Sequence, residues 1–223
     1  MKKLFGLLFV FVCSFALFAC SKKTEDTNTK KEETAQTVVT PVEEGEKSTV
    51  DALISEEFFS LCKDKEVYAT TCGQADLATL QVIIEDSLAD LDMEDPTHYE
   101  PDYSASDIPN GAILFLVVGG SLKGLGAAGV DVESEAARAT EFANKAKAGE
   151  ITLIVVHIGG SARRGDTSDP IIKAAAPKAN MLLVVETGNE DGYFTNVSKD
   201  NNIPLFLYSK QSKMKASIAK LFS

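Results

Sequence analysis

Glycine and basic residues occur together in two segments of the chain, where they could form a binding site for an anion. Residues 119–124 read Gly-Gly-Ser-Leu-Lys-Gly, and residues 159–165 read Gly-Gly-Ser-Ala-Arg-Arg-Gly. Each segment follows a continuous apolar run, so open backbone amides and basic side chains are expected at strand ends, a combination that suits a carboxylate or a phosphate. The two segments predict these ligand-binding residues: Gly120, Ser121, Lys123, Gly124, Gly160, Arg163 and Arg164.

A second interpretation of the same segments is purely structural. The glycines then only permit tight turns between strand and helix, and the bases pair with Asp166, Asp169 or Glu186. We favour binding, because bases among glycines stand out in an acidic protein. Other loops expected at the same edge of the sheet complete the predicted site with Gly73, Gln74, Asp76, His157, Asp166 and Asn189.

His157 also allows an enzymatic interpretation, in which it is the base that activates Cys72 or Ser121 as the nucleophile of a hydrolase or transferase. The sequence offers no third group to orient the histidine and no nucleophile-elbow motif. We therefore favour a binding module for a small anionic ligand over an enzyme. His157 itself is more often a structural residue at a strand end, and a scaffold role without a ligand stays open.

Cofactors and metals are not expected. Residues 124–129 match the glycine spacing of a dinucleotide site, but the next apolar run ends in His157, where an acidic residue or an arginine is needed to bind the ribose. No glycine-rich stretch continues into the Lys-Ser or Lys-Thr of a Walker loop. The histidines are His98 and His157 alone, and the acidic segment 91–110 lacks the aspartate spacing of a calcium loop.

The charge balance excludes binding of nucleic acid through a basic surface. The chain has 223 residues, with 22 basic and 33 acidic side chains and a formal net charge of −11. Apolar residues make up 44% of the chain, which is enough for one compact core.

The amino terminus predicts export and attachment to a membrane. Lys2 and Lys3 precede an apolar run over 4–18, which has the charged and hydrophobic parts of a secretory signal. The run falls short of the ~20 residues that cross a bilayer, so an uncleaved anchor is the less favoured alternative. Residues 17–20 read Leu-Phe-Ala-Cys, which resembles the lipobox of bacterial lipoproteins. The resemblance implies that Cys20 is diacylated and that the mature protein lies in the cell envelope, on the extracytoplasmic side of a bacterial membrane.

The sequence divides into four parts. We predict a lipoprotein signal peptide over 1–19, a disordered acylated tether over 20–49, a docking helix over 50–63 and an α/β domain over 64–223. The tether is rich in Lys, Glu and Thr, and such a composition buries too little surface to offset the entropy of ordering.

Strand and helix patterns alternate along the domain. Continuous Val, Ile and Leu runs, typical of strands buried on both faces, cover 67–71, 112–118, 151–158, 181–185 and 205–208. Helical patterns cover 75–89, 133–148, 170–179, 191–201 and 212–222. This alternation predicts a single doubly wound α/β domain of the Rossmann or flavodoxin-like class, with a mostly parallel five-stranded sheet and helices on both faces. In the flavodoxin-like order 2-1-3-4-5, strands 67–71 and 151–158 are neighbours, and Gln74 and Asp76 face His157 and Arg163 across a cleft.

Two further features have structural interpretations. The segment 91–110, with its acids and prolines, is predicted to be a solvated excursion from the sheet. Cys62 and Cys72 flank a strand whose length separates them beyond the reach of a disulfide, so both are predicted to be buried and free.

The loop motifs also carry a resemblance. Segments 119–129, 157–169 and 188–192, together with Gly-Gln-Ala-Asp at 73–76, resemble a bacterial protein family of unknown function whose members are secreted or lipid-anchored. The resemblance covers roughly residues 66–207. It supports the domain limits and the choice of loops, and it implies no activity.

Overall fold

The computed structural model of the protein describes residues 38–39 and 58–223. The predicted signal peptide, Cys20, the predicted tether apart from Val38–Val39, and residues 50–57 of the predicted docking helix lie outside the described residues. Within the described part, no helix is both long and apolar enough to cross a membrane.

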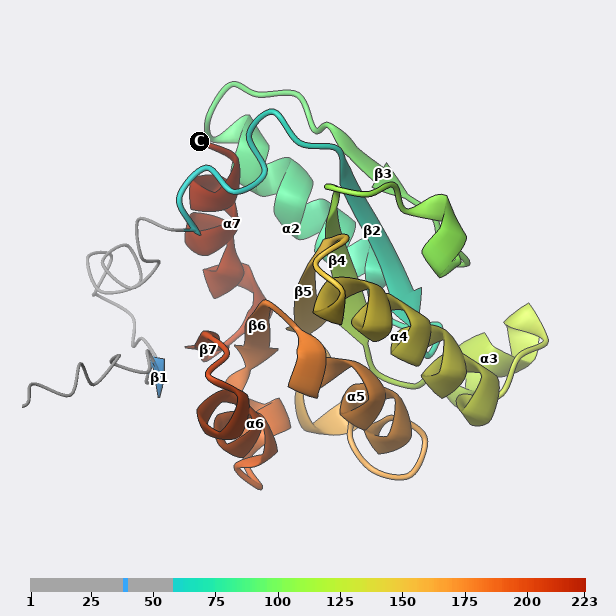
Figure 1. The fold of residues 1–223 in the computed structure, drawn as a ribbon. Helices are drawn as coiled ribbons and strands as arrows, with labels where there is room; N and C mark the ends of the chain where they lie inside the picture. Colours follow the sequence, from blue (N-terminus) through green and yellow to red (C-terminus); the bar gives the residue numbers. More distant parts are fainter. Residues whose placement is uncertain (1–37, 40–57) are drawn as a thin grey trace, which may run out of the picture. The chain divides into compact units, whose positions relative to one another are not determined.

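Six strands of the segment 58–223 form an all-parallel sheet in the order β7-β6-β5-β4-β2-β3 (Figure 1). A two-residue strand, β1 (Val38–Val39), pairs with β7. The sheet confirms the predicted doubly wound α/β class, with β3 and the two-residue β1 in addition to the five predicted strands. In chain order the six strands are β2 (Val67–Cys72), β3 (Thr97–Tyr99), β4 (Ile113–Val118), β5 (Thr152–His157), β6 (Met181–Val185) and β7 (Leu205–Tyr208).

The additional strand, β3, lies in the acidic segment that was predicted to be a solvated excursion. It pairs with the outer edge of β2, with Tyr68 opposite His98, and the Tyr99 hydroxyl donates to Asp95 at 2.6 Å. The predicted contact between strands 67–71 and 151–158 is wrong, because β4 lies between β2 and β5. When β3 is counted as the second of the six strands, the order becomes 2-1-3-4-5-6, so the error lies in the numbering of the strands.

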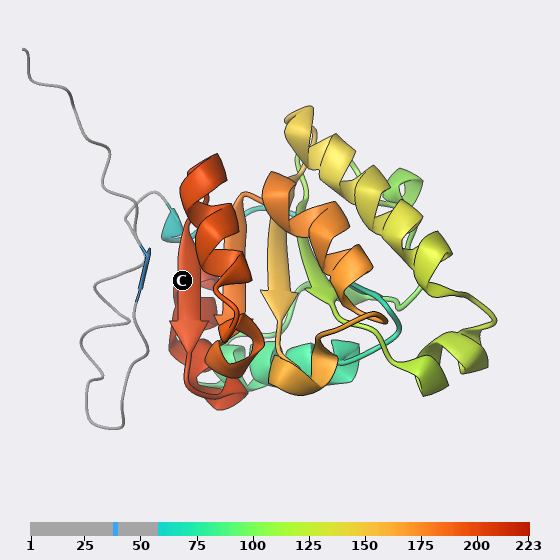
Figure 2. The ribbon, with the colours of Figure 1, turned by 90° about the horizontal axis from the view of Figure 1, so that it is seen from below.

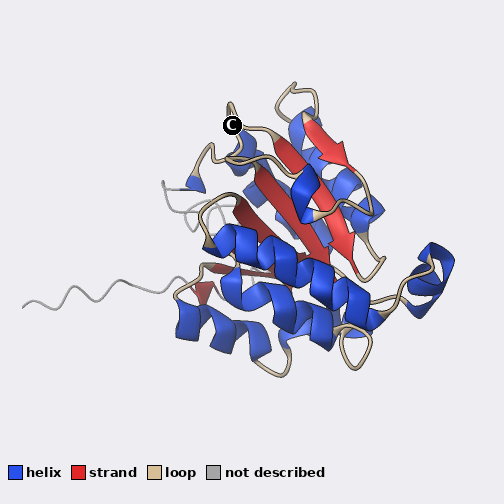
Figure 3. Ribbon diagram, turned by 45° about the vertical axis from the view of Figure 1, so that its right-hand side comes forward, coloured by secondary structure: helices blue, strands red, loops and turns tan. Residues whose placement is uncertain are grey.

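Helices cover both faces of the sheet (Figure 2). One face carries α2 (Leu77–Ala89) and α7 (Lys215–Phe222), and the other carries α4 (Val132–Lys147), α5 (Asp169–Ala175) and α6 (Tyr193–Asn201). Figure 3 shows the three-helix layer in front of the strands. A short helix, α3 (Leu122–Ala128), follows β4 and precedes α4 in the chain, and it projects from the body of the domain (Figure 1). Within residues 60–223, the 3-10 helices are η2 (Ala105–Asp107), η3 (Gly160–Arg163), η4 (Ala176–Lys178), η5 (Glu186–Asn189) and η6 (Gln211–Met214).

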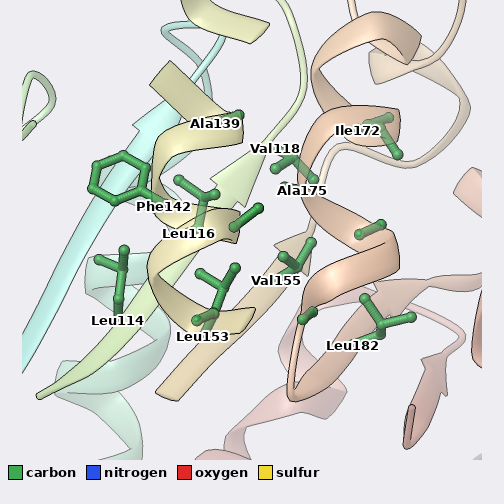
Figure 4. Packing of buried hydrophobic residues seen from close by; sticks show 14 of the residues in the cluster. Leu114, Leu116, Val118, Ala139, Phe142, Leu153, Val155, Ile172, Ala175 and Leu182 are labelled. Carbon is green, nitrogen blue, oxygen red and sulfur yellow. The ribbon is translucent and has the colours of Figure 1, made fainter. Parts of the chain in front are cut away.

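The strands have apolar side chains on both faces, which explains their continuous hydrophobic runs. In β4, Phe115 packs toward α2 and α7, whereas its neighbours Leu114 and Leu116 pack toward α4. Figure 4 shows the apolar cluster between the sheet and the layer of α4 and α5, in which Phe142 of α4 lies near Leu114 and Leu116. Because successive residues of a strand point to opposite faces, both helical layers are anchored by the same strand.

The helices differ in how their ends are capped. Asp131 caps α4 by accepting a hydrogen bond from the Ser134 backbone N–H at 2.7 Å, and Gly149 follows the helix with φ 73°. Ser168 precedes α5 but makes no capping bond. The predicted helix over 170–179 is divided between α5 and η4.

Residues 58–63, the described part of the predicted docking helix, form turns that pack on the carboxyl end of α7. The backbone N–H of Ser60 donates to the carbonyl of Lys220, and that of Cys62 donates to the carbonyl of Leu221. Cys62 and Cys72 are buried and free, in agreement with the prediction.

Phe142→Ala should lower the free energy of unfolding by about 3–5 kcal/mol, because Phe142 is fully buried between α4 and the sheet. Val82→Ala is the control, since Val82 on α2 is 54% exposed and its loss should cost about 0.5 kcal/mol or less. Urea unfolding followed by circular dichroism measures both. Equal losses in the two variants would contradict the assignment of Phe142 to the core.

Candidate functional site

The candidate site lies at the carboxyl ends of the parallel strands, where the connections that follow β2, β4, β5 and β6 meet at one edge of the sheet. Every predicted ligand-binding residue lies in these connections or at the strand end before them. The strand order reverses between β2 and β4, because the chain leaves β2 toward α2 on one face and leaves β4 toward α4 on the other. Doubly wound sheets bind ligands at such a switch point.

Glu135 of α4 occupies the switch point. It is 2% exposed, and its carboxylate accepts hydrogen bonds from the backbone N–H of Gly73 at 2.6 Å and from the side-chain amide of Gln74 at 3.3 Å. Left-handed backbone conformations at Gln74 (φ 57°) and Asp76 (φ 63°) shape the loop, at a cost in free energy for residues with a side chain. The Gly73 amide therefore donates to a carboxylate of the protein.

Arg138 neutralises Glu135 and links other segments to it. Its Nε and Nη2 donate to the two carboxylate oxygens at 3.0 and 2.8 Å. Nη1 and Nη2 also donate to the carbonyl oxygens of Tyr103 and Thr71. The sequence reasoning missed this pair, because charged residues on a helix usually face solvent. A signal existed, since Glu135 falls on the same buried stripe of α4 as Ala139.

The glycine-rich segment after β4 is also satisfied internally. The backbone N–H of Gly120 donates to the hydroxyl of Ser168 at 2.7 Å. The backbone N–H of Gly124 donates to the hydroxyl of Ser121 at 3.2 Å, which caps α3. Lys123 is exposed on α3. Of the predicted donors in this segment, the two glycine amides thus face protein oxygens.

Glycine at these positions permits the loops to touch one another directly. A side chain at Gly73 would overlap the carbonyl oxygen of Gly119, and a side chain at Gly124 would overlap the carbonyl oxygen of Gln74. Gly73 also has φ 105°, a conformation that residues with a side chain rarely adopt. The loops after β2 and β4 therefore pack backbone against backbone.

His157 is fully buried at the end of β5. Its Nδ1 lies 2.9 Å from the carbonyl oxygen of Val118, and its Nε2 lies 3.1 Å from that of Gly160. Burial lowers the pKa of His157 below its ordinary value, and burial raises the pKa of Cys72 to about 12. Both ring nitrogens thus face backbone carbonyl oxygens, to one of which the neutral ring can donate, and within the described residues His157 makes no hydrogen bond to Cys72 or Ser121.

Arg163 and Asp76 form an ion pair, with Nε 3.2 Å from Oδ2. The pair crosses Gly119, against which the Arg163 side chain packs. The two side chains meet although β4 separates the strands that precede them. Both remain partly exposed, at 32% for Arg163 and 21% for Asp76.

Arg164 is held by two carboxylates. Its Nε donates to Oδ1 of Asp169 at 2.9 Å, while Nη1 and Nη2 donate to Oδ1 and Oδ2 of Asp191 at 3.0 and 2.8 Å. Nη1 also donates to the carbonyl of Gly188. The bond between Arg164 and Asp191 raises the pKa of the guanidinium and lowers that of the carboxyl group. Asp169 is one of the partners that the structural interpretation predicted, whereas Asp166 is exposed.

A cavity of about 280 Å³ lies beside Arg164, at the ends of β5 and β6. Asn189 does not line the cavity, and its Oδ1 accepts a hydrogen bond from the backbone N–H of Phe194, in the first turn of α6, at 2.8 Å. Gly160 packs against the hydroxyl of Thr187. Arg164 is thus the predicted site residue that lines the cavity, together with Ser161, Gly165, Asp169, Thr187, Glu190 and Asp191.

Two larger cavities, of about 420 Å³ each, lie away from the predicted residues. One is between α2 and the η6–α7 segment, and the other is at the opposite edge of the sheet, near the ends of α4 and α6. Among residues 58–223, no group of three or more His, Cys, Asp and Glu side chains is placed to bind a metal ion.

Glu135→Gln should lower the free energy of unfolding by about 3–5 kcal/mol, because it removes the countercharge of the largely buried Arg138. Asp86→Asn is the matched control. It breaks the exposed ion pair with Lys215 (3.0 Å) and should cost about 1 kcal/mol or less. Chemical denaturation of the two variants gives the comparison, and a Glu135→Gln loss as small as the control would contradict the role of Glu135.

The comparisons with known proteins identify a family but no function. No curated protein and no solved structure matches the chain. The family model described as "Domain of unknown function (DUF6305)" matches residues 64–222, which span all the strands from β2 to β7 and all the loops of the candidate site. This chain therefore belongs to the DUF6305 family.

Proposed function

We propose that the protein is a lipid-anchored, extracytoplasmic binding module, and that it holds an anionic group of a small ligand at Arg164. The cavity beside Arg164 lies at the carboxyl ends of parallel strands, the edge at which open α/β sheets bind their ligands. Its lining offers a guanidinium for a carboxylate or phosphate and two hydroxyl groups, those of Ser161 and Thr187.

The position of Asp191 is the observation that carries this proposal. Its carboxylate accepts two parallel hydrogen bonds from Arg164, yet its side chain is 55% exposed. Because the Asp191 carboxylate faces water while the guanidinium is only 14% exposed, a ligand carboxylate can replace Asp191 and restore the same two hydrogen bonds. Asp169, at 25% exposure, is the more sheltered partner and keeps Arg164 in place.

The other predicted donors are less available. The amides of Gly73 and Gly120 already donate to Glu135 and Ser168. We therefore assign the ligand to the β5–β6 end of the site and regard the switch point as its structural support.

Arg164→Lys should weaken the binding of small carboxylates by about tenfold or more, because lysine cannot reproduce the paired hydrogen bonds. Asp191→Asn should strengthen it, because the competing charge is gone. Lys147→Gln, which removes one positive charge at the opposite edge of the sheet, is the control and should leave affinity unchanged.

Isothermal calorimetry with a panel of carboxylates and phosphates measures these affinities, and thermal melting shows whether each variant is folded. Absence of binding by the parent protein, or equal binding by Arg164→Lys, would overturn the proposal.

The membrane anchor is the second part of the proposal. It rests on Cys20 after the apolar run 4–18, and loss of Lys2 and Lys3 with the signal would change the formal net charge from −11 to −13. So acidic a body is repelled by anionic headgroups, and attachment then depends on the lipid.

Cys20→Ala should abolish acylation, so that the protein is released from the membrane or accumulates with its signal uncleaved. Detergent phase separation and mass spectrometry of the amino terminus distinguish these forms. A processed variant that still enters the detergent phase as the parent does would refute the lipoprotein assignment.

A further inference from the structure

We propose that the ligand of the Arg164 cavity is a zwitterion, with an ammonium group a few bonds from its carboxylate, as in an amino acid. This inference rests on the proposed function and adds the chemical class of the ligand. It follows from the charges that line the cavity and from the bonds that hold each of them.

The lining carries more negative than positive charge. It contains one guanidinium, that of Arg164, and three carboxylates, those of Asp169, Glu190 and Asp191. A ligand with only negative charge would gain one favourable contact and would be repelled by the remaining carboxylates. A ligand with an added ammonium group matches both signs.

The carboxylates differ in how firmly they are held. Asp169 accepts from Arg164 Nε at 2.9 Å and from the backbone N–H of Gly165 at 3.0 Å, so it stays bound when the ligand enters. Asp191 accepts from Arg164 and also from the backbone N–H of Tyr193 at 3.0 Å. When a ligand carboxylate takes over the Arg164 donors, the bond to Tyr193 keeps Asp191 at the rim of the cavity.

Displaced Asp191 then becomes a partner for the ligand. Its free oxygen and the exposed carboxylate of Glu190 lie on the same lining, next to the donors that the ligand carboxylate occupies. An ammonium group close to the ligand carboxylate can pair with both. The Asp191 carboxylate is then paired with the ammonium group, whereas a ligand without a positive charge would leave it unpaired.

The size of the cavity limits the ligand. At about 280 Å³ it is slightly smaller than typical small-molecule sites, and two of its lining residues, Ser161 and Thr187, are exposed to solvent. This volume suits a compact molecule with an amino-acid head group.

The test uses the purified full-length protein and calorimetric titration with each of the common L-amino acids. Each amino acid that binds is compared with its N-acetyl derivative, which lacks the ammonium charge, and with its carboxamide, which lacks the carboxylate. We expect at least one amino acid to bind, and each derivative to bind about tenfold or more weakly.

Variants separate this inference from the proposed function. Glu190→Gln combined with Asp191→Asn should remove the preference for the amino acid over its N-acetyl derivative, whereas Arg164→Lys should weaken both. If N-acetyl derivatives or simple carboxylates bind the parent as tightly as the amino acids, the inference that the ligand is a zwitterion is wrong, while the proposed anion site stands. If no anion or amino acid binds, or if Arg164→Lys changes no affinity, the proposed function is wrong as well.

Discussion

The direct contact of backbones between the loops after β2 and β4 is the constraint on which the rest of the site depends. A side chain at Gly73 would overlap the carbonyl oxygen of Gly119, and one at Gly124 would overlap that of Gln74. The two loops can therefore lie this close only because both positions are glycine. Their closeness brings the Gly73 amide within 2.6 Å of the Glu135 carboxylate, and the Gly120 amide lies 2.7 Å from the Ser168 hydroxyl. Amides that the sequence suggests for an external anion thus find oxygen acceptors inside the protein, as buried donors must.

The sequence was sufficient for the parts of the fold that depend on burial. Strands buried on both faces produce continuous apolar runs, so β2, β4, β5, β6 and β7 were all predicted. β3 has three residues at the edge of the sheet and no apolar run, so its signal was lost in an acidic, proline-containing segment. That omission shifted the numbering of the later strands and produced the false contact between β2 and β5. The ion pair between Arg164 and Asp191 also could not be predicted from the sequence, because the fold, and not the spacing of the two residues in the chain, brings them together.

The basic residues of the site show how an acidic protein balances its own charges. Arg138, Arg163 and Arg164 each pair with a carboxylate, but burial separates their roles. The side chains of Arg138 and Glu135 are 15% and 3% exposed, so breaking this pair would leave a charge without water, and the pair stabilises the fold. The pair of Arg164 with Asp191 is 14% and 55% exposed, so water can solvate the carboxylate that leaves. Replacing the carboxylate by a ligand therefore costs little free energy at the Arg164–Asp191 pair and a large amount at the Arg138–Glu135 pair.

This difference also explains why the proposed ligand site lies away from the switch point of the sheet. In a doubly wound fold the crevice between the diverging connections is the usual binding position. Here α4 places Glu135 in that crevice, and Arg138 ties it to the carbonyl oxygens of Thr71 and Tyr103, so a carboxylate of the protein stands where a ligand anion would. A cavity at the same edge lies between the connections after β5 and β6, where it is lined by Arg164 and by the exposed carboxylate of Asp191. In the proposed function, Glu135 fills the switch point and the ligand binds instead at the ends of the neighbouring strands β5 and β6.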